Sequence, residues 1–233
     1  MTGTKWTLNR HLNWKRIGVS IKNRLLDLLY PQVCGICGKF APYWLCIKCR
    51  KMLEGYEVRG EVLFKFKNFT KLIYIFPYDG IIREMLLNYK FNEKPYIYNS
   101  FVNFIIKNQE TFENLKKYDK IIPVPISKKR FKERGYNQSY LIAKSLAKKL
   151  EIECDAKVLC KIKNNKEQNK LNKEQREINA IGAYKISKNS NLEGKKVLLL
   201  DDIYTTGNTA NECCKILKEA NPKLIDVFVL AKD

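Results

Sequence analysis

The chain has 233 residues, with 44 Lys or Arg against 24 Asp or Glu, so its formal net charge is +20 at pH 7. This length allows one good core with a small appendage. Apolar runs all fall short of the ~18 residues that a membrane span needs, which excludes a transmembrane protein and leaves a soluble or peripheral one. The first residues show no secretory pattern, so we expect a cytoplasmic protein with reduced thiols.

The first sixty residues predict two small units ahead of the main domain. Apolar residues at helical spacing over 15–30 predict an amphipathic helix, which belongs to an N-terminal extension of residues 1–30. We expect this helix to pack onto the cysteine module or the main domain. The alternative is contact of its basic face with an anionic membrane surface such as the inner membrane. Residues 31–60 form a cysteine module, whose final part, 50–60, is predicted to be a linker helix.

Two Cys-x-x-Cys pairs give the module a metal signature, Cys34 with Cys37 and Cys46 with Cys49. Two such turns facing each other place four thiolates around one tetrahedral Zn²⁺ at ~2.3 Å. Four protein ligands leave no open position, so we expect a structural and not a catalytic zinc. Iron is the alternative for the same ligands.

From about residue 70 the pattern alternates between strands and helices. This alternation predicts an α/β domain over 61–233, with a mainly parallel sheet flanked by helices. The predicted strands are 72–76, 120–124, 158–162, 182–186, 197–203 and 224–230. The predicted helices are 81–91, 97–107, 138–150 and 208–220.

A basic turn follows the predicted strand over 120–124. Its cations, Lys128, Lys129 and Arg130, come after a strand end and before a helix, which suits a pyrophosphate seat. A solvated basic loop is the alternative. Just beyond them, Arg134 and Tyr136 offer a cation and a stacking surface for nucleic acid.

The polar stretch over 163–176 is too long for a simple connection. We interpret it as a mobile loop, with Gln168 and Arg176 as candidate residues and with cations that neutralise a leaving pyrophosphate. A disordered insertion is the alternative.

The run from Val197 to Thr209 carries the strongest functional signal. Four apolar residues predict a strand buried on both faces, and Asp201 and Asp202 follow at its carboxyl end, where parallel sheets place ligands. A glycine-containing, hydroxyl-rich turn then opens a helix and suits a phosphate. The turn consists of Thr205, Thr206, Gly207, Asn208 and Thr209. A sugar phosphate with vicinal hydroxyls satisfies both halves of the run.

These thirteen residues resemble the signature of type I phosphoribosyltransferases, which bind phosphoribosyl pyrophosphate (PRPP). The resemblance implies the type I phosphoribosyltransferase fold, here with a small N-terminal zinc-binding module. It implies that Asp201 and Asp202 act on the ribose 2′- and 3′-hydroxyls, that the 205–209 turn holds the 5′-phosphate, and that Mg²⁺ accompanies PRPP. The run fits neither the dinucleotide-binding nor the Walker pattern.

The order of the motifs narrows the resemblance to the ComF family of competence proteins. The four cysteines, Tyr78-Asp79-Gly80, Pro123-Val124-Pro125, the 134–138 segment and the PRPP run follow one another as in that family. The resemblance implies a role in DNA uptake for natural transformation, with single-stranded DNA and a ComFA-type helicase as partners. The basic charge agrees with a polyanionic partner, although a Lys- and Asn-rich composition also explains it.

Three functions therefore stay open. The first is a PRPP- and Mg²⁺-binding protein of DNA uptake, with or without turnover. The second is a non-catalytic PRPP-sensing, DNA-binding module, and the third is a nucleobase phosphoribosyltransferase of salvage metabolism. Thr205 stands where 6-oxopurine salvage enzymes usually carry an Asp, which disfavours hypoxanthine and guanine as substrates.

Overall fold

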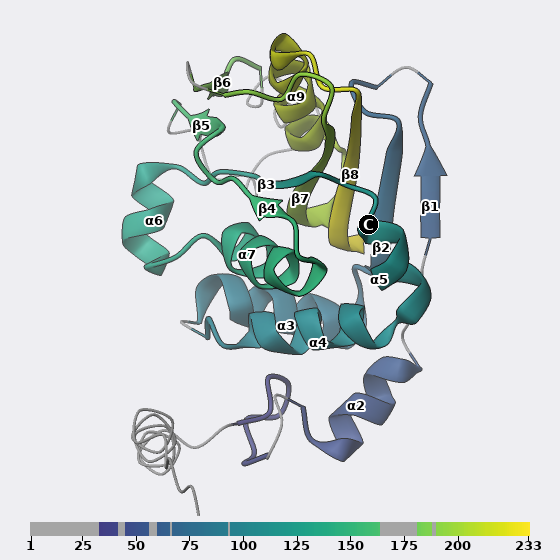
Figure 1. The fold of residues 1–233 in the computed structure, drawn as a ribbon. Coiled ribbons are helices and arrows are strands. Elements are labelled where there is room, and N and C mark those ends of the chain that lie inside the picture. The colour runs from purple at the N-terminus through teal and green to yellow at the C-terminus, as the bar shows by residue number, and fades with distance from the viewer. Residues whose placement is uncertain are drawn as a thin grey trace, which may run out of the picture.

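The computed structural model describes residues 33–41, 45–55, 60–65, 67–92, 94–163, 181–187 and 190–233. A twisted sheet with helices on both faces makes up most of this part, and the cysteine module lies beyond the helices of one face (Figure 1). The helix predicted over 15–30 and the loop residues Gln168 and Arg176 lie outside the described residues.

The main sheet has six strands in the order β1-β2-β8-β7-β3-β4. Every neighbouring pair is parallel except the pair of β1 with β2, which confirms the predicted, mainly parallel sheet. The strands are β1 (Gly60–Leu63), β2 (Lys71–Pro77), β3 (Lys120–Pro123), β4 (Glu153–Cys154), β7 (Lys196–Tyr204) and β8 (Leu224–Lys232). A separate antiparallel pair joins β5 (Leu159–Lys161) to β6 (Tyr184–Ile186).

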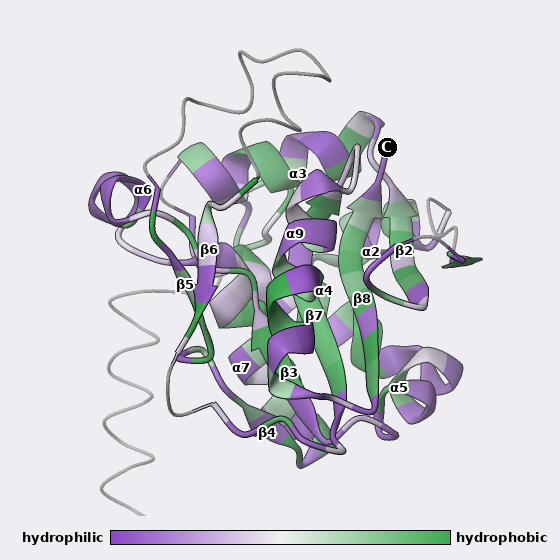
Figure 2. Cartoon of the chain, turned by 90° about the horizontal axis from the view of Figure 1, so that it is seen from above, coloured by the Kyte–Doolittle hydropathy of each residue, from purple (hydrophilic) through white to green (hydrophobic). Residues whose placement is uncertain are grey.

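The sheet divides the core into two apolar layers, one on each of its faces, and helices cover both layers. The first layer packs under four helices: α3 (Gly80–Phe91), α4 (Ile97–Lys107), α5 (Gln109–Leu115) and α7 (Gln138–Leu150). The second layer lies under α9 (Asn208–Leu217), which continues as the 3-10 turn η2 (Lys218–Ala220), and under the β5–β6 pair. Figure 2 shows the most apolar colouring along β7 and β8, between these layers.

Strand β7 lies inside the sheet and is buried over most of its length. Val197 to Leu200 have no exposed surface, as expected for a strand covered on both faces. Because side chains alternate, Leu198 and Leu200 belong to the first layer, while Val197 and Leu199 belong to the second. The end of β7 is therefore held rigidly from both sides.

The cysteine module packs against the first layer of helices. Its helix α2 (Ile47–Glu54) buries Leu53 in the same cluster as the core of α4. The backbone of Gly35 also lies close to α4, since a Cβ on Gly35 would be 2.7 Å from Oγ of Ser100. The linker helix predicted over 50–60 is therefore wrong in its bounds. It begins earlier because the sulfur of Cys46 accepts from the Cys49 N–H and caps it.

The basic segment after β3 is also not a turn. Lys128, Lys129 and Arg130 form the first turn of helix α6 (Lys128–Arg134), because Ser127 Oγ accepts from the Arg130 N–H and caps it. The strand β1 and the helix α5 were not predicted either. These elements are short, so the sequence shows no sustained period in them.

Candidate functional site

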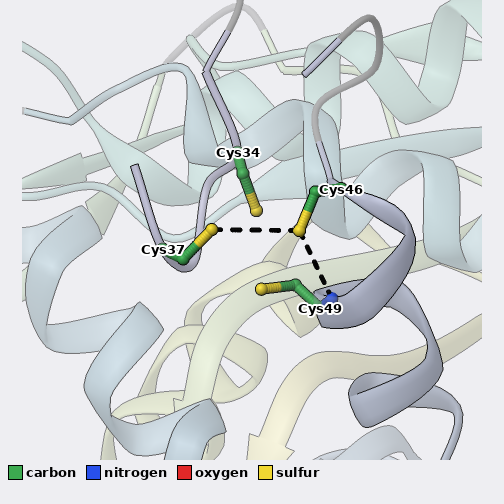
Figure 3. Close-up of side chains that lie close together, drawn as sticks. All are labelled: Cys34, Cys37, Cys46 and Cys49. Carbon is green, nitrogen blue, oxygen red and sulfur yellow. Dashed lines mark hydrogen bonds between the residues drawn. The ribbon is translucent and has the colours of Figure 1, made fainter. Parts of the chain in front are cut away.

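The four cysteines form a compact cluster at the start of α2 (Figure 3). Their sulfur atoms all lie within 4.8 Å of one another, and Cys37 Sγ lies 3.8 Å from Cys46 Sγ. Tetrahedral Zn–S bonds of ~2.3 Å separate the sulfurs by about 3.8 Å, so this spacing is consistent with zinc. Burial opposes ionisation of Cys34, but neighbouring backbone N–H groups donate to it and lower its pKa to about 7.

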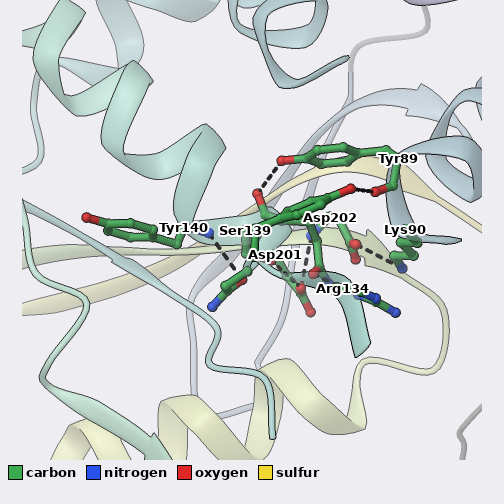
Figure 4. A network of polar contacts seen from close by, with 10 residues as sticks. Tyr89, Lys90, Arg134, Ser139, Tyr140, Asp201 and Asp202 are labelled. Atoms are coloured by element: carbon green, nitrogen blue, oxygen red, sulfur yellow. Dashed lines mark hydrogen bonds and ion pairs between the residues drawn. The ribbon is translucent and has the colours of Figure 1, made fainter. Parts of the chain in front are cut away.

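The two carboxylates of β7 take different partners. Oδ2 of Asp202 lies 2.9 Å from Nζ of Lys90 on α3, and Oδ1 of Asp201 accepts from Oγ of Ser139 at 3.1 Å (Figure 4). Ser139 belongs to the first turn of α7. The acids thus connect the end of the central strand to two helices of the first layer.

Burial dominates the electrostatics of this pair. It raises the pKa of Asp201 to about 7, and the neighbouring Asp202 carboxylate adds to the rise. Lys90 and hydrogen bonds from the Asp202 N–H and Ser139 oppose it. Among the described residues, only the ammonium group of Lys90 is in ion-pair contact with these two carboxyls, so the pair favours additional hydroxyl donors or a hard cation.

The turn that follows is shaped by Gly207. Its φ of +78° lies in the left-handed region, and a Cβ there would overlap the ring of Tyr204. Gly207 is the N-cap residue of α9, so the helix begins at this turn and its dipole favours an anion there. Only glycine adopts this positive φ and leaves room for the Tyr204 ring without strain.

A cavity of about 380 Å³ brings the acids and the turn together. It opens at the carboxyl ends of β7 and β3, the usual ligand edge of a parallel sheet. Of the predicted site residues, those that line it are Asp201, Asp202, Thr205, Thr206, Gly207, Asn208, Thr209 and Arg130. Lys128 and Lys129 are not among its lining residues, and Lys129 pairs with Glu133 at 3.9 Å.

Cations of other elements complete the cavity, and the sequence analysis missed them. Arg83 and Lys90 line it from α3, and their spacing with Leu87 is that of one helix face. That periodicity could have found them. Lys161 lines it from β5, with Nζ 3.3 Å from the hydroxyl of Tyr184. Burial lowers the pKa of Lys161, and the nearby Arg130 lowers it further.

The two predicted nucleic-acid residues are held by internal contacts beside the cavity. The hydroxyl of Tyr136 donates to the Tyr89 carbonyl, and the two rings lie 5.7 Å apart. Nη1 of Arg134 donates to Oε1 of Gln138 at 2.7 Å, and its guanidinium covers the Phe91 ring. A role in DNA contact stays a prediction for both.

Comparison with known proteins places this geometry in a family. Residues 137–233 match the family model of the phosphoribosyl transferase domain. Competence protein F of Haemophilus influenzae is 28% identical over 199 residues, which are 83% of this chain and 86% of that protein. Competence protein ComFC of Bacillus subtilis is 28% identical over 191 residues, 81% of this chain and 72% of that protein.

The chain belongs to the ComF family. A further relative, the DNA utilization protein YhgH of Escherichia coli O6:H1, is 22% identical over 86% of this chain and 90% of that protein. The relatives of the ComF chain are thus named as competence or DNA utilization proteins, and the chain itself carries a phosphoribosyltransferase domain. Its fold is the predicted α/β type I phosphoribosyltransferase fold.

The matched domain accounts for only part of the cavity in this ComF protein. It begins at the N-cap of α7 and includes both acids and the turn. Lys90 and Arg130 precede it, as do the four cysteines. Across the described ranges, the ComF chain has no helix with the length and apolar character needed to cross a bilayer.

Proposed function

We propose that this ComF protein binds PRPP together with Mg²⁺ and acts in DNA uptake, where it binds single-stranded DNA. One observation supports the PRPP proposal above all. A single cavity joins a carboxylate pair, a glycine turn that opens a helix, and cations from three other elements. This combination suits a ligand with hydroxyls at its centre and phosphates at both ends.

Each end of PRPP has a counterpart in the cavity. The 205–209 turn would take the 5′-phosphate, through backbone N–H groups and threonine hydroxyls. Asp201 and Asp202 would accept from the ribose hydroxyls, since ionised carboxylates are pure acceptors. Arg130 and Lys161 would hold the pyrophosphate by charge-assisted hydrogen bonds.

The acid pair also fits the proposed Mg²⁺, because carboxylate oxygens are the ligands that this hard cation prefers. When bound, the ion would screen the charge of the pyrophosphate. The chain itself would orient the ribose and neutralise the leaving group, with Arg130 and Lys161 placed for the latter. Zinc in the four-cysteine cluster would stabilise the module and take no part in this chemistry.

Isothermal titration calorimetry with PRPP and Mg²⁺ tests the site. We expect Asp201→Asn and Asp202→Asn each to weaken binding about 10- to 100-fold, as for loss of a charged hydrogen-bond partner. Asp119→Asn is the matched control, because Asp119 sits at the opposite end of β7 and accepts from the Lys196 N–H. Absence of binding to the unaltered protein would refute the PRPP proposal.

The DNA proposal depends on the family and on the net charge of +20. We expect a labelled oligothymidylate to bind with an affinity that falls linearly with the logarithm of salt concentration, because phosphate contacts release counterions. Pyrophosphate release from PRPP, with and without this strand, tells turnover from binding alone. A ComFA-type helicase remains the proposed protein partner, tested by co-purification.

A further inference from the structure

Helix α6 is ordered at both ends and yet buries no residue. Ser127 caps its start, and the Gly135 N–H closes its end on the Phe131 carbonyl at 2.8 Å. Five of its seven residues are Lys or Arg, and Figure 2 shows it as a hydrophilic helix at the margin of the molecule. A seven-residue helix without a packed face is marginal by itself, so the caps hold it in place.

Phe131 is the one apolar residue of this polar helix, and it is 52% exposed. Phe91 at the end of α3 is similarly exposed, at 51%, and it lines the cavity. Between them lies Arg134, whose guanidinium carbon is 5.0 Å from the centroid of the Phe91 ring. Phe131 and Arg134 are three residues apart on one helix, so their side chains are neighbours.

These three residues, Phe131, Arg134 and Phe91, form what we call the aromatic–basic strip. Arg130 extends from the same helix into the cavity, so the strip reaches the cavity mouth. Its single acidic neighbour on α6 is Glu133, which lies within 3.9 Å of Lys129. The strip thus combines exposed rings with a surplus of positive charge.

We propose that the aromatic–basic strip binds single-stranded DNA and leads it past the mouth of the cavity. Lysines and arginines contact the phosphates, and the phenylalanine rings stack on bases. Bases of a duplex are already stacked on one another, so the rings favour a single strand. The choice of DNA depends on the proposed function; the location depends on the exposed rings and the charge of α6.

The strip also differs from the contact expected from the sequence. Tyr136 was the predicted stacking residue, but its ring packs against Tyr89 inside the first layer. Phe131 makes stacking possible without displacing a core contact. Its removal is therefore expected to leave the fold intact, since exposed side chains contribute little to stability.

Fluorescence anisotropy with a labelled oligothymidylate of about 20 nucleotides tests the strip in the full chain. Phe131→Ala and Phe91→Ala should each raise Kd about 5- to 150-fold, the range for loss of one stacked base (~1–3 kcal/mol). Phe40→Ala is the matched control, because it removes a phenylalanine that is 77% exposed on the cysteine module. A loss in the Phe40 variant with no loss in the other two would overturn the proposal.

Salt dependence provides a second measurement that does not involve the rings. Lys132→Ala should flatten the salt slope by about 0.7, the value for one lost phosphate contact on a single strand, whereas Lys148→Ala at the far end of α7 should not. Equal slopes for both variants would place the phosphates elsewhere. Stronger binding of duplex DNA, of oligouridylate or of a polyglutamate peptide than of oligothymidylate would also refute the strip as a site for single-stranded DNA.

PRPP titrations separate this proposal from the one on which it depends. Phe131→Ala should bind PRPP like the unaltered protein, because Phe131 is outside the cavity lining. If the unaltered protein binds no oligonucleotide at low salt, the DNA function itself fails. If it binds and neither Phe131→Ala nor Phe91→Ala weakens it, only the location fails.

Discussion

The ammonium group of Lys90 lies 2.9 Å from Oδ2 of Asp202 and joins α3 to the end of β7. Only 17% of the Lys90 side chain and 5% of the Asp202 side chain are exposed, so water screens the two charges weakly. A buried pair of this kind is costly to break, because the remaining partner keeps an uncompensated charge. The pair therefore fixes both the helix and the carboxylate at the cavity wall.

Replacing Lys90 should show how much the stability of the fold depends on this ion pair. We expect Lys90→Met to lower the free energy of unfolding by about 3 kcal/mol, measured by urea denaturation at pH 8. The double variant Lys90→Met with Asp202→Asn should recover most of the loss, because it removes both charges of this ion pair. Lys144→Met on exposed α7 surface is the control, and an equal effect there would argue against a buried pair.

Asp201 should make stability depend on pH in a particular direction. The folded protein holds this proton up to about pH 7, while the ordinary pKa is 3.8. Between these values the folded state binds more protons than the unfolded chain, so stability falls as the pH rises from about 4 to 7. Asp201→Asn should flatten this fall and be the more stable protein at pH 8. Parallel curves for the variant and the unaltered protein would contradict the raised pKa.

Gly207 should tolerate no side chain. Gly207→Ala forces both a positive φ and an overlap with Tyr204, so we expect it to destabilise the fold and to weaken PRPP binding about tenfold or more (~1.4 kcal/mol). Gly194→Ala separates the two causes, since Gly194 has a φ of +69° but open space around its Cβ. It should show the backbone strain alone and bind PRPP normally. Identical behaviour of both variants would mean that the Tyr204 contact is irrelevant.

The cysteine cluster should bind one metal ion with all four sulfurs. Cys46→Ser removes a metal ligand but keeps a side-chain oxygen that can cap α2, so we expect metal content to collapse and, through loss of the metal, the thermal midpoint to fall by about 5 °C or more. Elemental analysis of purified protein identifies the metal, and stoichiometric iron would replace zinc in this account. Cys160→Ser, outside the cluster, should change neither quantity.

Local signals in the sequence predicted the parts of the site that are local in space. The buried run of β7, its two acids and the turn at Gly207 follow one another directly, so pattern and chemistry pointed to the same edge. The helices over 97–107 and 138–150 have clear apolar periods and were predicted within their observed bounds. Helices with a continuous apolar period can therefore be predicted from the sequence with their bounds.

Contacts between distant segments could not be predicted in the same way. Lys161 reaches the cavity only because the β5–β6 pair folds over the second layer, and no spacing in the sequence reports that. Helix α6 buries nothing, so it has no apolar period to detect. The early start of α2 depends on a cysteine sulfur acting as a cap, a role that helix propensities do not include.

The packing of the cysteine module against the first layer has a practical consequence for purification of the protein. Leu53 of α2 is 1% exposed and belongs to the same buried cluster as the core of α4. If the proposed metal were lost and the module loosened, apolar surface of the sheet domain would become exposed, and such surface promotes aggregation. Chelators and oxidants should therefore be kept out of the purification buffers. Turbidity after dialysis against EDTA would be the first visible sign of demetallation, ahead of any ligand or DNA assay.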